Sequence, residues 1–235
     1  MDAMKNSSDA LGREVEIKLD LGSLENYRKL LRAYDAFDAG ELQCNGFFDS
    51  PEKTLWHAGW ALRVRAEPTA GLVTIKSRIA RSVRPATIRE ELEARISKET
   101  ALEVLGGRKE ILELNVKPLW FITARFGDLK LGKTLQFDNW RQKKTAMLGS
   151  RRSTIEIDRT EFPDGSVDFE LEVELGDPGE TAVVEKALRR LLRDLEIPFR
   201  VQTASKLERA LQRTDLVDLD GGLVDDNNGD DRALH

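Results

Sequence analysis

The chain has 235 residues, 40% hydrophobic and 34% charged, which suits one globular domain with a substantial core and excludes a wholly disordered chain. With 37 lysines and arginines and 42 aspartates and glutamates, the chain has a net charge of −5. This charge argues against a broad basic surface that binds the phosphates of duplex nucleic acid. A single cysteine, Cys44, and only two histidines exclude an internal disulfide and zinc or iron–sulfur chemistry, so any chemistry must rest on carboxylates, lysine and arginine.

The folded domain is expected over residues 13–213, between two polar ends. Residues 1–12 are expected to form a flexible leader, and residues 214–235, rich in aspartate, a disordered acidic tail. No apolar run reaches the 18 residues of a membrane span, and no segment resembles a signal peptide. The sequence therefore predicts a cytoplasmic protein that does not enter a membrane.

Strand-like and helical segments alternate along the domain. The helices are predicted from apolar residues at helical spacing and from capping signals, such as the serine and glutamate of Ser205-Lys206-Leu207-Glu208. In chain order, the elements are a strand over 14–18, a helix over 23–37, strands at 62–65, 75–78 and 91–93, a weaker helix over 97–105, strands at 140–143, 155–158 and 169–175, and helices over 181–195 and 205–213.

The strands carry charges on one face and apolar residues on the other. Alternate residues of a strand point to opposite faces, and a charged pair two residues apart arises by chance in about 12% of cases, the square of the 34% charged fraction. Seven segments with this pattern exceed that expectation. Some strands carry only basic residues, such as Arg63 and Arg65, whereas others are mainly acidic, such as the strand with Glu170, Glu172 and Glu174.

Two architectures accommodate this pattern. In the first, an open antiparallel sheet presents its charged face to solvent and helices cover the other face. In the second, the strands close into an eight-stranded antiparallel β-barrel with an inward charged face, an α+β fold whose outer surface is covered by the amphipathic helices. The segregation of charge favours the second. Burying so many charges requires partners, and carboxylates beside lysines and arginines are typical of a site for a divalent cation and a polyphosphate.

The charged segments also match an ordered series of motifs. Glu14-Val15-Glu16-Ile17-Lys18 resembles the ExExK signature of the CYTH superfamily, the triphosphate tunnel metalloenzymes. Further matches follow in the order of the family, from Arg13 to Arg213: Phe47-Phe48-Asp49-Ser50-Pro51, Gly59-Trp60-Ala61-Leu62-Arg63-Val64-Arg65, Thr74-Ile75-Lys76-Ser77, Arg89-Glu90-Glu91-Leu92-Glu93, Asn139-Trp140-Arg141, Ile155-Glu156-Ile157-Asp158, Phe169-Glu170-Leu171-Glu172-Val173-Glu174 and Ser205-Lys206-Leu207-Glu208-Arg209.

The resemblance implies an eight-stranded tunnel that hydrolyses, or sometimes cyclises, triphosphates with Mg²⁺ or Mn²⁺. The metal-facing carboxylates would be Glu14, Glu16, Asp158, Glu170, Glu172 and Glu174. The phosphate oxygens would be held by Lys18, Arg63, Arg65, Lys76, Arg141 and Lys206. The catalytic candidates are Lys76, Lys18, Glu91 and Glu93, and the second choices for the tunnel are Arg78, Arg89, Lys143, Glu156 and Arg209.

The substrate expected from this resemblance is inorganic triphosphate, cleaved to diphosphate and phosphate. Thiamine triphosphatase, nucleotide or RNA 5′-triphosphatase and adenylyl cyclase of the same superfamily are alternatives, and no single motif separates them. A non-catalytic polyphosphate-binding module is a further alternative, although a pure anion receptor gains nothing from carboxylates beside its ligand. The expected partner is a small triphosphate, and a homodimer through the outer apolar surface is a weaker expectation.

Overall fold

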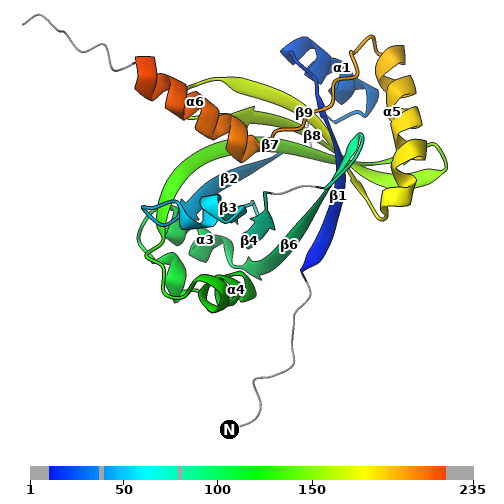
Figure 1. Ribbon diagram of the computed structural model, residues 1–235. Helices are drawn as coiled ribbons and strands as arrows, with labels where there is room; N and C mark the ends of the chain where they lie inside the picture. The colour runs from blue at the N-terminus through cyan, green and yellow to red at the C-terminus, as the bar shows by residue number, and fades with distance from the viewer. Residues whose placement is uncertain (1–10, 37–39, 79–80, 221–235) are drawn as a thin grey trace, which may run out of the picture.

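The computed structural model describes residues 11–36, 40–78 and 81–220 (Figure 1). Most of the predicted leader and the residues after 220 lie outside these ranges. The strands are β1 (Gly12–Asp20), β2 (Gly40–Asp49), β3 (Trp60–Ala66), β4 (Gly71–Ser77), β5 (Arg81–Val83), β6 (Ala86–Ile96), β7 (Gly132–Leu148), β8 (Arg151–Glu161) and β9 (Val167–Leu175). The α-helices are α1 (Leu24–Ala33), α2 (Thr54–His57), α3 (Lys98–Leu105), α4 (Lys117–Phe126), α5 (Thr181–Asp194) and α6 (Lys206–Asp220), and short 3₁₀ helices span Ile111–Glu113 and Pro178–Glu180.

Eight of these strands close into an antiparallel barrel. They follow the order β1-β9-β8-β7-β2-β3-β4-β6, and β6 returns to pair with β1, with Gly12 opposite Glu91 and Ile17 opposite Ala86. The short β5 adds to β6 outside this ring. The predicted barrel is confirmed, and the open-sheet alternative is wrong. Closure gives every barrel strand two neighbours, so no barrel edge is left to pair with another chain.

The apolar faces of the strands point outward and are covered by helices. On one side of the barrel, Ile17, Ile157 and Leu171 are fully buried in a core shared with α1 and α5. On the other side, Leu62 and Ile75 pack in a core shared with α3 and α4. Each such side chain contributes about 1.5–3 kcal/mol when fully buried. The outer cores therefore stabilise the barrel, and the charged faces are left to line its interior.

The helix α6 packs on a third apolar cluster. Its Leu207 and Ala210 contact a group that includes Phe47, Phe137 and Phe162. The predicted capping box is present, because Ser205 N donates to Glu208 Oε2 at 2.8 Å and Glu208 N donates to Ser205 Oγ at 3.2 Å. These contacts fix the first turn of α6 against the barrel.

The helices α6 and α4 differ from the sequence prediction. The end of α6 was expected near Arg213, yet the helix continues to Asp220 and takes in the first residues of the predicted tail. Arg213 Nη2 donates to Asp168 Oδ1 at 2.7 Å, and this contact anchors the helix at its expected end. The helix α4, which was not predicted, begins with Pro118 in its first turn and ends before Gly127. Within the described residues, no helix is both long and apolar enough to cross a membrane.

Candidate functional site

The barrel interior contains a cavity of about 480 Å³ whose lining is mostly charged. Because the charged residues alternate with outward-facing core residues on each strand, many of the predicted site residues converge on this space. Those that line it are Glu14, Glu16 and Lys18 of β1, Arg63 and Arg65 of β3, Lys76 of β4, Glu91 and Glu93 of β6, Arg141 of β7, Glu172 and Glu174 of β9, and Lys206 of α6. The second choices Arg78, Arg89, Lys143 and Glu156 line it as well.

Three predicted residues lie outside the cavity lining. Asp158 and Glu170 are 0% and 1% exposed, and they lie in the barrel wall beside Glu172. Arg209 does not line the cavity either, because it is held by Glu170 at 2.8 Å and by Asp168 at 2.8 Å. These three residues are therefore shielded from a ligand in the cavity.

One wall of the cavity, formed by β3, holds two arginines with weak ionic partners. Arg63 Nη2 is 4.0 Å from Glu93 Oε2. Arg65 donates to the neutral Asn45 Oδ1 at 2.9 Å and lies 3.5 Å from Glu67. Burial, together with the positive charges of Arg63 and Arg141, lowers the pKa of Arg65 to about 9. An anion placed beside this wall would relieve that repulsion.

A buried network of neutral side chains supports Arg65, and the sequence analysis did not identify it. Thr160 Oγ1 donates to Asn139, Asn139 Nδ2 donates to Gln43, and Gln43 Nε2 donates to Glu67, which lies beside Arg65. The signal was present in β2, where Gln43, Asn45 and Phe47 alternate with its other face. Alternation of charge does not reveal this network, because its members on β2 are uncharged.

A second group within the cavity consists of carboxylates around Lys76. Lys76 Nζ forms an ion pair with Glu14 Oε2 and lies 3.3 Å from Glu91 Oε2 and 4.0 Å from Glu16 Oε1. Glu174 lies near the same carboxylates. Partial burial, then the negative charges of Glu14 and other nearby glutamates, raises the pKa of Glu174. The four carboxylates Glu14, Glu16, Glu91 and Glu174 outnumber the cations beside them, which are Lys76 and, next to Glu16, Lys18 and Arg89. Carboxylate oxygens in such excess fit Mg²⁺ or Mn²⁺.

A third group of charges is closely paired. Arg141 donates to both oxygens of Asp158, at 2.8 and 2.5 Å, and to Glu172 at 2.5 Å, and it also forms an ion pair with Glu156. Lys18 Nζ lies 3.0 Å from Glu16 and 3.6 Å from Glu172. Burial alone would lower the pKa of Lys18, but Glu16 and Glu172 hold it above its usual value.

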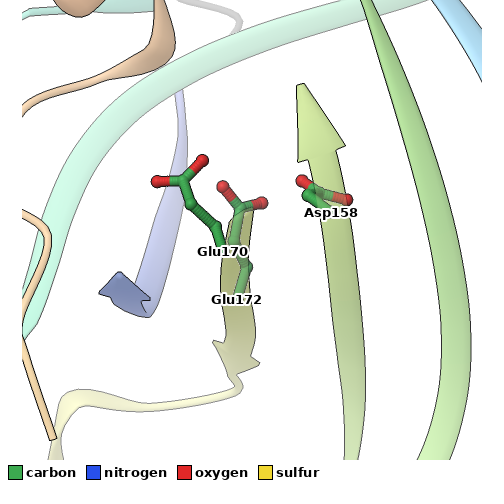
Figure 2. A group of neighbouring side chains, drawn as sticks. All are labelled: Asp158, Glu170 and Glu172. Atoms are coloured by element: carbon green, nitrogen blue, oxygen red, sulfur yellow. The ribbon is translucent and has the colours of Figure 1, made fainter. Parts of the chain in front are cut away.

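Lys206 completes this third group at its buried end. Its Nζ lies 2.9 Å from Asp158 Oδ2, 2.7 Å from Glu170 Oε2 and 2.7 Å from Glu172 Oε1. Figure 2 shows these three carboxylates close together, Asp158 on β8 and the two glutamates on β9. Burial would raise the pKa of Asp158 and of Glu172, but Lys206 and Arg141 hold both below their usual values. Within the described residues, these three form the one carboxylate group compact enough to surround a metal ion directly.

Comparisons with known proteins support the fold and the family. Three solved structures resemble the chain. HpAC1 from Hippeastrum is described as a candidate adenylyl cyclase with a dominant triphosphatase activity (TM-score 0.75, 24% identity, 85% of this chain and 96% of that one). The others are a candidate adenylate cyclase from Bacillus halodurans (TM-score 0.63, 19% identity, 85% and 98%) and PH1819 from Pyrococcus horikoshii (TM-score 0.52, 18% identity, 84% and 99%). Among curated protein sequences no match is found.

At identities below 25%, these structural similarities establish the fold alone. The match to a family model also establishes the family. The model of the CYTH domain matches residues 12–211, the span that contains the barrel strands and the first part of α6. The motif series from Glu14 to Arg209 lies within the same span. The chain therefore belongs to the CYTH family.

Proposed function

We propose that the protein is a divalent-metal-dependent hydrolase that cleaves the terminal phosphate of inorganic triphosphate, giving diphosphate and phosphate. The observation that carries this proposal is the division of one cavity into an arginine wall with weak ionic partners and a carboxylate group with excess negative charge. A polyphosphate alone would suit the first, and a divalent cation alone would suit the second. A metal-chelated polyphosphate suits both together.

The arginine wall supplies the phosphate contacts in this proposal. Arg63 and Arg65 project from alternate positions of β3 into the same cavity, and both are weakly paired. Guanidinium groups bind phosphate oxygens with paired, charge-assisted hydrogen bonds. Their distances from Glu93 and Glu67 allow each to exchange that distant carboxylate for a phosphate oxygen.

The metal would be held by Glu14, Glu16 and Glu174. When bound there, it would neutralise charge on the phosphate oxygens as the terminal phosphoryl group is transferred. Lys76, which contacts Glu14, lies where it can stabilise the oxygen of the leaving diphosphate, or give it a proton. Lys18, between Glu16 and Glu172, is the other cation able to serve the leaving group.

The remaining requirement is an oriented water. Its oxygen attacks the terminal phosphorus, the bridging P–O bond breaks, and the electron pair leaves with the diphosphate. Glu91 and Glu93 line the cavity on β6 and are the carboxylates assigned to orient this water and accept its proton. In-line positioning and charge neutralisation account for most of the catalysis in such transfers.

Inorganic triphosphate is preferred because the cavity offers little to an organic leaving group. Phe47 is the one aromatic side chain along the described lining, and its ring is engaged by Phe137 at a centroid distance of 5.4 Å. A base or a thiazole would normally be held by an exposed aromatic face. The dominant triphosphatase activity named for the Hippeastrum protein supports hydrolysis over cyclisation.

A substrate panel tests the proposal directly. Inorganic triphosphate, ATP, GTP and thiamine triphosphate are offered with Mg²⁺ or Mn²⁺, and release of phosphate and of cyclic AMP is measured. We expect the highest kcat/KM for inorganic triphosphate. Because the Hippeastrum and Bacillus proteins are both described as candidate adenylyl cyclases, cyclic AMP formation is the specific rival outcome, and its dominance would overturn the proposal.

A further inference from the structure

Four uncharged polar side chains are buried in the barrel wall beside Arg65. They are Thr160 of β8, Asn139 of β7, and Gln43 and Asn45 of β2, and each is 0–2% exposed. None of them lines the cavity. Buried amide and hydroxyl groups are costly unless they form hydrogen bonds, so their partners indicate what they hold in place.

Hydrogen bonds join three of these side chains into a row across neighbouring strands, here termed the polar row. In the strand register, Thr160 lies opposite Asn139 and Asn139 lies opposite Gln43. Thr160 Oγ1 donates to Asn139 Oδ1 at 2.7 Å, and Asn139 Nδ2 donates to Gln43 Oε1 at 3.0 Å. Because its oxygen is used in this way, Gln43 turns its Nε2 to Glu67 and donates to Glu67 Oε1 at 2.9 Å. The polar row therefore has a direction, and it ends in a donor that binds a carboxylate of the cavity lining.

This donor holds Glu67 away from Arg65. The Glu67 Oε1 atom that accepts from Gln43 at 2.9 Å lies 3.5 Å from Arg65 Nη1. Asn45, directly opposite Arg65 in the register, accepts from Arg65 Nε at 2.9 Å, and Asn45 Nδ2 donates to the backbone oxygen of Gln43. Within the described residues, the guanidinium group of Arg65 has no other hydrogen-bond partner, although its side chain lines the cavity.

We propose that the polar row restrains Glu67 and thereby keeps the terminal N–H groups of Arg65 available to a phosphate oxygen. Gln43 and Asn45 are positioning residues in this arrangement: Gln43 restrains the competing carboxylate, and Asn45 fixes the plane of the guanidinium group. The orientation of that plane matters because a guanidinium group binds phosphate oxygens in a fixed, paired geometry. This inference rests on the phosphate contact proposed for Arg65, but it does not require that the bound triphosphate be hydrolysed.

Substitution of Gln43 with methionine tests the inference by steady-state kinetics on inorganic triphosphate with Mn²⁺. Without its partner, the Glu67 carboxylate is free to pair closely with Arg65 and to compete with the substrate. We expect KM to rise at least about tenfold, the effect of about one charge-assisted hydrogen bond. The value of kcat should stay within about threefold of wild type, because Arg65 holds the substrate equally in the ground state and the transition state. Gln142→Met is the matched control, since Gln142 is a buried glutamine that accepts from Tyr27 at 3.0 Å outside the cavity lining; its KM should remain at the wild-type value.

A second substitution separates this role from a general disturbance of the barrel wall. Gln43→Met/Glu67→Gln removes the carboxylate that competes for Arg65, so its KM should return to within about threefold of the value for Glu67→Gln alone. Damage to the wall would not be repaired by that change. A KM that does not rise in Gln43→Met, or that stays high in the double variant, would overturn the inference.

Thr160→Val decides the matter if Gln43→Met does not fold, because it removes only the hydroxyl group at the far end of the polar row. Its KM should rise at least about threefold, and Glu67→Gln should again abolish the increase; no increase would overturn the inference. If the wild type binds inorganic triphosphate with Mn²⁺ but does not hydrolyse it, the proposed function is refuted, and Kd from isothermal titration replaces KM in the same comparisons. If it neither binds nor hydrolyses triphosphate, both proposals fail.

Discussion

Replacing Lys76 with methionine tests the catalytic role proposed for this residue separately from its contribution to stability. Methionine keeps most of the apolar stem of the side chain and removes the ammonium group. In the structure, Lys76 contacts Glu14 and Glu91 inside the cavity, whereas its neighbour Ile75 supplies the buried core contact on the outer face. The substitution therefore removes charge from the site without opening a hole in the core.

The two effects differ in size. Loss of one preorganised charge at the reacting group typically lowers the rate by about 10²–10³, or about 2.7–4 kcal/mol of transition-state stabilisation. The ion pairs of Lys76 are 20–24% exposed, so we expect an unfolding free energy lower by only about 1 kcal/mol or less. The variant should be folded at room temperature and almost inactive.

Two measurements on the same preparation test this expectation. Steady-state phosphate release from inorganic triphosphate with Mn²⁺ gives kcat and KM, and urea unfolding followed by circular dichroism gives the free energy of unfolding. Lys29→Met is the control, since Lys29 pairs with Glu25 on α1, remote from the cavity lining. A Lys76→Met turnover within about threefold of wild type, less than 1 kcal/mol, would refute the role assigned to Lys76.

Three further predictions concern the buried charges and the metal. Asp158→Asn should lower the free energy of unfolding by about 3–5 kcal/mol, because it removes a fully buried negative charge that pairs with Arg141 and Lys206. Urea unfolding measures this, and a loss below about 1 kcal/mol would contradict the prediction. The lowered pKa values of Asp158 and Glu172 should stabilise the fold above about pH 4, and this stability should be lost as the pH falls further through their native values. Urea titrations from pH 7 to pH 3 check the sign, and a flat profile would count against it. Glu174→Gln should raise the Mn²⁺ concentration needed for half-maximal activity at least about tenfold. Glu161→Gln, which lies outside the cavity, is the control, and the same Mn²⁺ dependence in Glu174→Gln and wild type would exclude Glu174 as a ligand.

The barrel could be predicted because its signal is local. A strand such as β9 carries Glu170, Glu172 and Glu174 on one face and Leu171 and Val173 on the other, and this alternation is visible in the sequence. The inward direction of the charges followed from their segregation by sign and from the order of the family motifs. Closure itself, through the pairing of β1 with β6, was supported by the resemblance and not by any single segment.

The arrangement within the site could not be predicted from sequence. Lys206 reaches Asp158 and Glu172 only because α6 docks on the barrel, and the three residues are far apart in the chain. The alternation of charged and apolar residues identifies all three as charged positions, but it does not predict which of them form ion pairs with one another. The helix α4 was missed for another reason, because its segment from Lys117 to Phe126 matches no family motif, although Pro118 and Gly127 mark its ends.

The ion pairs inside the barrel also affect which anions can bind in its cavity. An incoming phosphate meets guanidinium groups that already have distant carboxylate neighbours, so binding exchanges one counterion for another. A monovalent anion such as chloride gains little from that exchange, whereas a chain with several charges replaces several counterions at once. The barrel should therefore discriminate between anions by their charge and bind triphosphate more tightly than the less highly charged orthophosphate.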